Sequence, residues 1–196
     1  MNRGENETAD FVNDAESLAA ASQGGDPAAF DRLVLMYKDR IYNLCYRFLG
    51  AHADAEDAAQ DTFMKVYTSI NQFKFQSSFS TWLYRIAVNT CKNKLKSFSW
   101  KSLFSFKAIT PDALTEIADS RPSPDMRLQS RQRGRAIEKA ILELPVAQRL
   151  VVVLRDIEGL SYEEISSITG LNQGTVKSKL SRARHALRDK LKDIVA

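Results

Sequence analysis

The sequence predicts an all-α protein of two small helical domains joined by a flexible linker. Apolar residues recur at intervals of three and four through most of the 196 residues. No segment of convincing length alternates between apolar and polar residues as a strand does. Between residues 98 and 124 the helical period is lost among prolines and serines. We therefore expect domains over 26–97 and 125–196, with 98–124 as the linker and 1–25 as an N-terminal tail with a short helix.

Capping residues predict where the first helices begin and end. Residues 1–13 are polar and acidic and predict a disordered tail, which leads into a helix from Asp14 to Gln23. Asp26 and Pro27 form an N-cap and first-turn pair. The apolar period that follows them predicts a long helix that ends at Gly50.

A third helix is predicted from Ala53 to about Ile70, and its two halves differ. The positive end of a helix dipole favours acidic side chains, but one or two of them satisfy it. The first half carries more than that, namely Asp54, Glu56, Asp57 and Asp61. The second half offers apolar side chains for a core, namely Phe63, Val66, Tyr67 and Ile70.

Residues 71–80 mix phenylalanines with amides and serines and predict a loop. Exposed aromatic rings beside amides suit stacking on unpaired bases, although each ring could instead anchor the loop to the core. The next helix, Thr81 to about Ser97, has a polar face without an acid: Arg85, Asn89, Lys92, Asn93, Lys94 and Lys96. Such a face is either simply solvated or follows a nucleic-acid backbone, and the adjoining aromatic loop favours the second interpretation.

The second domain is expected to begin near Asp125, with a helix that stops at Pro145. Another helix is predicted from about Val146 to Glu158, where Gly159 closes it. Its expected inward face consists of Leu150, Val151, Leu154 and Ile157. With the two helices that follow, these elements predict a winged-helix-like or four-helix DNA-binding domain.

Residues 161–192 predict a helix-turn-helix. Ser161 and Glu164 have the spacing of a capping box, Gly170 ends the first helix, and Asn172 caps the second. The apolar stripe of the second helix is Val176, Leu180, Ala183, Leu187 and Leu191. The opposite face is Lys177, Ser178, Ser181, Arg182, His185 and Arg188. A glycine turn and a basic, small-polar outer face indicate a DNA reader.

The composition argues against most other chemistries. A net charge of +4 permits a nucleic-acid partner without requiring one. The chain lacks an HExxH motif, a phosphate-binding glycine loop and a GxSxG motif, so we expect no catalytic residue, no cofactor and no metal. His52 lies near Asp54, Glu56 and Asp57, but helical spacing spreads these side chains around the axis.

The compartment also follows from composition. We expect a cytoplasmic protein without membrane insertion, because no signal peptide and no sufficiently long apolar run is present. Cys45 and Cys91 lie in apolar helical patterns and predict two buried free thiols, with a disulfide or redox switch as the alternative.

Three segments, residues 54–63 (DAEDAAQDTF), 79–97 (FSTWLYRIAVNTCKNKLKS) and 144–191 (starting LPVAQRLVVV), resemble bacterial RNA polymerase sigma factors of the small extracytoplasmic-function (ECF) class. The resemblance covers most of the chain, and the order of the three is specific. It implies a transcription initiation factor that binds core polymerase, recognises promoters and melts them. It further implies a stress or envelope-response regulon and control by an anti-sigma factor, which could hold the protein at the inner membrane.

The resemblance implies roles for individual residues. The acidic helix is similar to the segment that binds the clamp helices of the largest polymerase subunit, with Asp54, Glu56, Asp57, Gln60 and Asp61 as the matching residues. The loop and the next helix resemble the part that holds the melted non-template strand of the −10 element, with Phe73, Phe75, Ser78, Phe79, Trp82, Arg85, Asn89, Lys92, Asn93 and Lys94. The helix-turn-helix resembles the reader of the −35 duplex, with Thr175, Lys177, Ser178, Ser181, Arg182, Arg184 and His185.

The same sequence features argue against two other functions. A free-standing helix-turn-helix regulator that binds DNA as a dimer would leave the acidic helix and the aromatic loop unexplained. An enzyme acting on nucleic acid would need catalytic residues that the chain lacks. The linker supports the first function, since its 27 residues reach up to about 90 Å, whereas elements two DNA turns apart lie about 70 Å apart.

Overall fold

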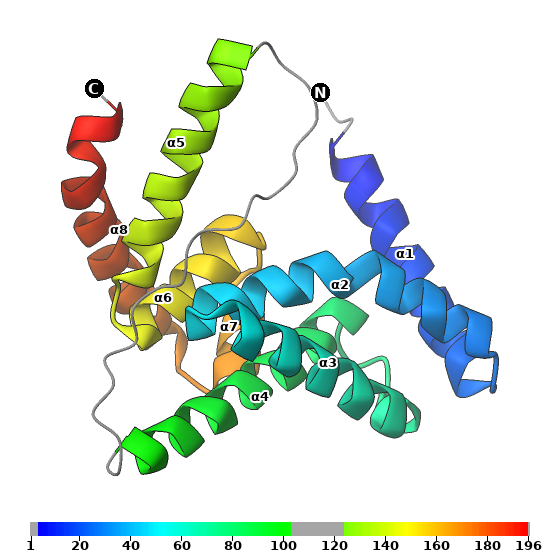
Figure 1. Ribbon diagram of the computed structural model, residues 1–196. Coiled ribbons are helices and arrows are strands. Elements are labelled where there is room, and N and C mark those ends of the chain that lie inside the picture. Colours follow the sequence, from blue (N-terminus) through cyan, green and yellow to red (C-terminus); the bar gives the residue numbers. More distant parts are fainter. Residues whose placement is uncertain (1–3, 103–123, 196) are drawn as a thin grey trace.

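The computed structural model describes residues 4–102 and 124–195, with side chains over 14–96 and 133–192. Two groups of helices make up these residues, and no strand occurs among them (Figure 1). The first group consists of α1 (Gly4–Gln23), α2 (Pro27–Leu49), α3 (His52–Ser69), the 3₁₀ turn η1 (Ile70–Gln72) and α4 (Phe79–Ser102). The second consists of α5 (Pro124–Leu142), α6 (Val146–Val152), the π-helical turn η2 (Val153–Ile157), α7 (Tyr162–Thr169) and α8 (Gln173–Val195). The predicted all-α class is confirmed.

The caps predicted for α2 are present. The Asp26 carboxylate accepts a hydrogen bond from the Ala28 N–H at 2.9 Å, and Pro27 occupies the first turn. Gly50 ends the helix at φ 84°, a left-handed conformation that glycine adopts without a steric cost. Between these caps one face of α2 is buried in the core.

Two helices are longer than their sequence pattern predicts. α1 begins at Gly4 rather than Asp14, so the expectation of a disordered tail is wrong for residues 4–13. Once Ala15, Leu18 and Ala19 are packed in the core, adding turns at the free end costs little, because nucleation is the expensive step. α4 likewise starts at Phe79 and continues through Ser102, five residues into the predicted linker. The rest of that linker, 103–123, lies outside the described residues.

The helix predicted from Val146 to Glu158 changes its winding at Val153. The Glu158 N–H bonds the Val153 carbonyl at 3.0 Å, a five-residue step that makes η2 a π turn. The wider turn rotates the side chains that follow it. As a result Ile157, which was expected to face inward, is 41% exposed.

The helix-turn-helix forms as its caps predict. The Ser161 hydroxyl accepts from the Glu164 N–H at 3.1 Å, and the Glu164 carboxylate accepts from the Ser161 N–H at 2.8 Å. Gly170 ends α7 at φ 77°, and the Asn172 side chain accepts from the Thr175 N–H at 2.8 Å. These local bonds fix the angle at which α8 leaves α7.

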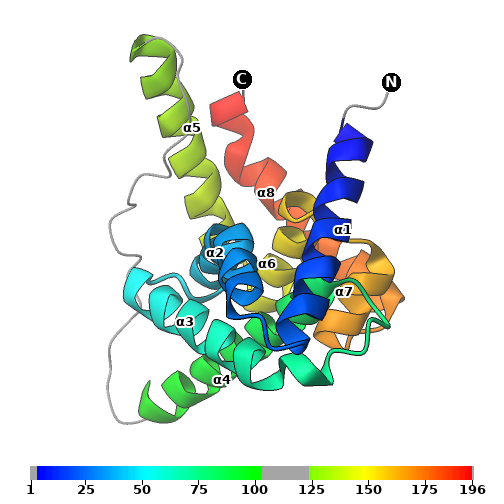
Figure 2. The same cartoon turned by 90° about the vertical axis from the view of Figure 1, so that its right-hand side faces the viewer.

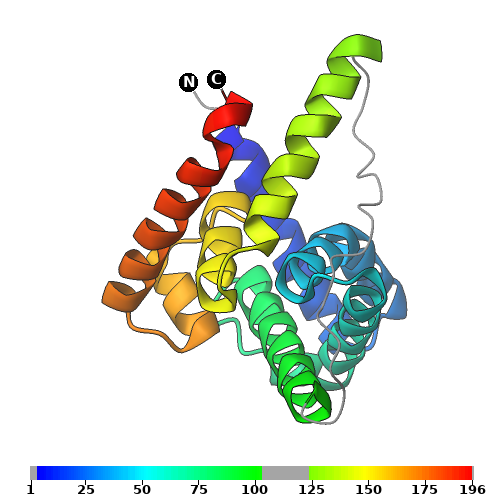
Figure 3. The ribbon, with the colours of Figure 1, turned by 60° about the vertical axis from the view of Figure 1, so that its left-hand side comes forward.

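The two groups of helices pack against each other. α4 lies along α7, while α2 lies against α5 and α6 (Figures 2 and 3). Their apolar side chains form one continuous buried cluster, from Leu33 and Phe79 in the first group to Leu154 and Val176 in the second. Within the described residues, no helix is both long and apolar enough to span a membrane.

Candidate nucleic-acid interface

The acidic residues of α3 lie on its exposed side. Asp54 is half-buried, while Glu56, Asp57, Gln60 and Asp61 are exposed. The Lys94 ammonium of α4 lies 3.7 Å from Asp57 and 3.6 Å from Asp61. Solvated ion pairs of this kind contribute about 0–1 kcal/mol, so both carboxylates are available to a partner.

Exposed apolar side chains adjoin these acids, and sequence reasoning missed them. Met64 is 62% exposed and follows Asp57 and Asp61 at helical spacing along α3. Tyr67, expected in the core, is 61% exposed, although its ring packs edge-on against Phe30 at 5.0 Å. The spacing of Met64 from the acids was the signal that could have revealed this mixed acidic and apolar face.

The aromatic loop divides into buried and exposed rings. Phe73 and Phe79 are 4% and 1% exposed, with ring centroids 5.7 Å apart. In this structure both rings therefore anchor the loop to the core, which was the alternative to the expectation that they face a base. Trp82 is half-buried beside Phe73, with the centroids 5.3 Å apart. Phe75 is 45% exposed at φ 55°, a strained conformation that costs on the order of 1–3 kcal/mol.

Ser78 is half-buried directly before the first residue of α4. Its hydroxyl accepts from the Thr81 N–H at 3.2 Å and lies 2.8 Å from the Thr81 hydroxyl and 3.0 Å from that of Ser80. The loop therefore enters α4 through a fixed hydroxyl network. The Phe75 ring remains accessible beside this network.

Two basic residues of α4 bind groups of α7 in the same chain. Arg85 donates from Nη2 to the Ser167 hydroxyl at 2.5 Å, and Lys92 donates to the Thr169 carbonyl at 3.1 Å. Burial lowers the pKa of Lys92, and the neighbouring Lys96 lowers it further. Asn89 and Asn93 are exposed.

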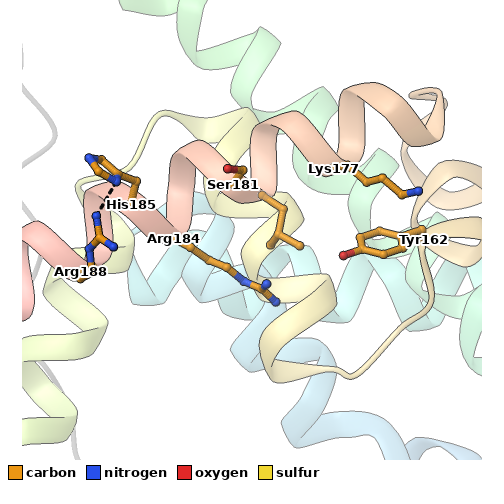
Figure 4. A pocket seen from close by; sticks show the side chains of 7 residues that line it. Tyr162, Lys177, Ser181, Arg184, His185 and Arg188 are labelled. Atoms are coloured by element: carbon orange, nitrogen blue, oxygen red, sulfur yellow. Dashed lines mark hydrogen bonds between the residues drawn. The ribbon is translucent and has the colours of Figure 1, made fainter.

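The helix-turn-helix carries a basic pocket of about 430 Å³ (Figure 4). Lys177 lies over the Tyr162 ring at 5.4 Å, and Arg155 lies 5.0 Å from the same ring. Seven residues line the pocket, namely Tyr162, Lys177, Leu180, Ser181, Arg184, His185 and Arg188. It brings together Lys177, Ser181, Arg184 and His185 of the predicted −35 residues but not Thr175, Ser178 or Arg182. Tyr162 was not identified from the sequence as a residue of this site, although it is the first residue of α7, directly after the Ser161 cap.

The cations of this pocket differ in how firmly they are held. Arg184 points towards η2 (Figure 4) and forms two hydrogen bonds to the Asp156 carboxylate, at 3.0 and 2.5 Å. These bonds raise the pKa of Arg184. His185 Nδ1 lies 2.7 Å from Arg188 Nη2, and its Nε2 lies 3.4 Å from Asp189. The predicted −35 residues that do not line the pocket lie elsewhere on α8. Ser178 donates to the Thr175 carbonyl at 3.0 Å, whereas Arg182 is exposed.

His52 and the two cysteines pack against other residues of the first helix group. His52 stacks on Tyr46 with centroids 4.4 Å apart, and its Nδ1 lies 2.6 Å from the Tyr42 hydroxyl. Cys45 and Cys91 are both free and buried, as predicted. The hydrogen bond to Cys91, together with burial, raises the pKa of the Cys45 thiol.

The chain matches two protein-family descriptions, Sigma-70 region 2 over residues 33–101 and Sigma-70 region 4 over residues 134–187. It is 38% identical to the ECF RNA polymerase sigma factor SigW of Bacillus subtilis, over 87% of this chain and 92% of that protein. It is 36% identical to the ECF RNA polymerase sigma-E factor of Escherichia coli K12, over 91% and 94% of the two chains. Among solved structures, sigma factor RpoE in complex with the anti-sigma factor NepR, from Bartonella quintana, superposes with a TM-score of 0.71 at 26% identity, covering 83% of this chain and 96% of that one.

Proposed function

Because the chain belongs to the extracytoplasmic-function sigma factors of bacterial RNA polymerase, we propose that it binds core polymerase and directs it to promoters with particular −10 and −35 elements. The observation that carries this proposal is the combination of both matched regions in one chain, in that order. The acidic face of α3 and the basic pocket of the helix-turn-helix give each region a surface for its partner. Catalysis of RNA synthesis remains with the polymerase.

We assign the surfaces as follows. Residues 26–97 would bind polymerase through the α3 acids and the melted −10 strand through α4 and Phe75. Residues 125–196 would bind the −35 duplex, with phosphates in the pocket formed around Lys177 and Arg188. The pocket supports this role, since cations around an open concave surface suit a phosphate backbone.

The partner of the Bartonella quintana protein leads to a second part of the proposal. That relative was solved with an anti-sigma factor. We propose that this chain is likewise controlled by an anti-sigma factor, in response to stress or an envelope signal. Its site of action would be the cytoplasm, and a membrane-bound anti-sigma factor would hold it at the inner membrane.

Run-off transcription tests the function directly. Purified chain and core polymerase are incubated with a library of genomic fragments, and the transcript starts are mapped. We expect starts that depend on the added chain and share two elements about two DNA turns apart. A start pattern that is the same without the chain, together with tight duplex binding by the chain alone, would favour the free-standing regulator instead.

A further inference from the structure

One glutamine of α1 binds the aromatic loop that joins α3 to α4. Gln23 is the last residue of α1, and its Nε2 donates to two carbonyls, that of Ile70 at 2.8 Å and that of Phe73 at 2.7 Å. Both partners are acceptors, so the amide NH₂ group, with its two N–H donors, is the group that faces the loop. Figure 2 shows the C-terminal end of α1 beside the segment that leads from α3 into α4.

The main chain around Gln23 is itself held in place. Leu18 and Ala19 anchor the preceding turn of α1, since both are buried in the core. Beyond the helix, the Asp26 N–H donates to the Ala21 carbonyl at 3.1 Å, and the Asp26 carboxylate caps α2. Gln23 therefore extends from a rigid joint between two packed helices.

The Phe73 carbonyl that Gln23 binds belongs to the residue that supports the exposed ring of Phe75. The Phe73 ring is buried, with its centroid 5.3 Å from that of Trp82. The Phe75 ring lies against it, with the two centroids 4.6 Å apart. Core packing thus fixes the side chain of Phe73 while Gln23 fixes its main chain, and the position of the Phe75 ring depends on both.

Phe75 needs such support because its backbone is strained. In the described part of the chain it is the one residue other than glycine with a positive φ, at 55°. A conformation of this kind persists only where the surrounding groups determine it. The ring is also 45% exposed, so solvent does not hold it in place. A base stacks on a ring that is already ordered at a lower entropic cost than on a ring that must first be ordered.

We propose that Gln23 is a positioning residue for the −10 strand, because its two hydrogen bonds hold the loop in the conformation in which Phe75 stacks on one unpaired base. This inference rests on the proposed function. Gln23 acts through the main chain of Phe73 and needs no contact of its own with DNA. The segment before residue 26, expected from the sequence only as a tail with a short helix, is thereby part of the −10 site.

The test uses the full chain and compares variants of the same joint. Gln23→Met has a side chain of similar length without either donor. Gln23→Glu also removes both donors and places a carboxylate against the two carbonyls. Asp26→Ala is the control, since it removes the cap of α2 without changing the side chain that binds the loop. Circular dichroism establishes that each variant is folded.

Hydrogen exchange of the free chain, measured by NMR, tests the loop without DNA. The Phe73 N–H donates to the Ile70 carbonyl at 3.0 Å, and both residues are bound by Gln23. Exchange at Phe73 should be several-fold faster in the two Gln23 variants than in the wild type and unchanged in Asp26→Ala. Equal exchange in all four folded proteins would overturn the positioning role.

Fluorescence anisotropy tests base capture, with the chain bound to core polymerase and a single-stranded −10 oligonucleotide from a mapped promoter. Removing the base that stacks on Phe75 should weaken binding by the wild type about tenfold. This penalty should largely disappear in both Gln23 variants and persist in Asp26→Ala. Because each ratio is taken within one variant, a change in net charge or stability cancels.

Two results of the anisotropy experiment would overturn the inference. One is a full penalty in the folded Gln23 variants, and the other is a wild type in which no single base carries such a penalty. Chain-dependent transcript starts in the run-off experiment decide the proposed function separately, so a failure of the positioning role is distinguishable from a failure of that function.

Discussion

Arg182 and Arg184 lie two positions apart on α8 but have different surroundings. Arg182 is exposed, whereas Arg184 is held by two hydrogen bonds to Asp156. Such a bidentate pair satisfies the guanidinium and fixes it against η2. An arginine that is free to reach a guanine edge makes a specific contact, and a guanidinium already held by a carboxylate does not.

Arg182→Ala should therefore weaken −35-dependent transcription by about 1–3 kcal/mol and relax the preference at one base pair. Arg184→Ala should leave this preference intact and lower stability by up to about 1 kcal/mol, because it removes an exposed ion pair. Transcription from promoters with single substitutions in the −35 element measures both effects. Unchanged selectivity in Arg182→Ala would remove Arg182 from the reading residues.

The thiol of Cys45 predicts a dependence of stability on pH. In the folded state the hydrogen bond to Cys91 and burial raise the pKa of this thiol above its ordinary value of 9.0. Below pH 9 the thiol is protonated in both the folded and the unfolded chain, so its full contribution to stability is present. As the pH rises further, only the thiol of the unfolded chain ionises, and this contribution is lost. We expect the free energy of unfolding to fall by up to about 1.4 kcal/mol per pH unit above pH 9. Urea titrations from pH 8 to 10 should show a shallower fall in Cys45→Ala, and equal slopes would contradict the assignment.

At the scale of elements, the capping box of α7 gives a stability prediction. Ser161 and Glu164 satisfy each other's backbone N–H groups at the start of an eight-residue helix. Ser161→Ala removes one acceptor and should lower stability by about 1 kcal/mol, within the range of 0.5–2 kcal/mol for such caps. Chemical denaturation measures this loss. Ser161→Asp, which keeps a capping oxygen, should restore most of it, and a variant as unstable as the alanine form would contradict the cap's role.

The acidic face of α3 gives a binding prediction. Asp57→Lys/Asp61→Lys should weaken the affinity for core polymerase at least about tenfold, or 1.4 kcal/mol, because the partner surface would meet cations. The fold should survive, since both carboxylates are exposed and their pairs with Lys94 are weak. Asp31→Lys/Asp39→Lys on the exposed side of α2 makes the same change in charge and serves as the control. Equal retention of polymerase by both folded variants in a pull-down would contradict the assignment.

The elements that sequence predicted well are those that depend on local bonds. Asp26, Gly50, Ser161 and Gly170 act within one turn of the residues that they cap, so their spacing reveals them. Phe73 and Phe79 were harder, because their burial depends on Tyr37 and Trp82 from other helices. The π turn at η2 was not predictable either, since it inserts one residue into an otherwise regular period and turns Ile157 outward.

The contact between α4 and α7 illustrates the same limit for the site. Arg85 and Lys92 have the composition of a solvated or DNA-binding face, and the sequence pattern contains no sign that Ser167 and Thr169 cover it. Hydrogen bonds between polar residues about 80 positions apart leave no periodic pattern in the sequence. The predicted surfaces therefore had the expected residue types, but their accessibility followed from tertiary structure alone.

At the scale of the whole molecule, the continuous core predicts that both helix groups unfold together. Leu154 is fully buried in the second group, and Leu154→Ala should cost about 2–5 kcal/mol. Both tryptophans, Trp82 and Trp100, belong to α4 in the first group. In Leu154→Ala, the unfolding midpoint measured by tryptophan fluorescence should therefore fall by as much as the midpoint measured by circular dichroism. A fluorescence transition that is unmoved by Leu154→Ala would show two independent folding units.

The hydrogen bonds that join α4 to α7 connect two parts of one polypeptide, so their formation is a unimolecular process. Its equilibrium position does not change with protein concentration, unlike capture by a separate inhibitor, whose occupancy falls on dilution. Each part also meets the other at a fixed effective concentration set by the chain that connects them. The contact between α4 and α7 should therefore form equally well in a cell that holds few copies of the protein and in one that holds thousands.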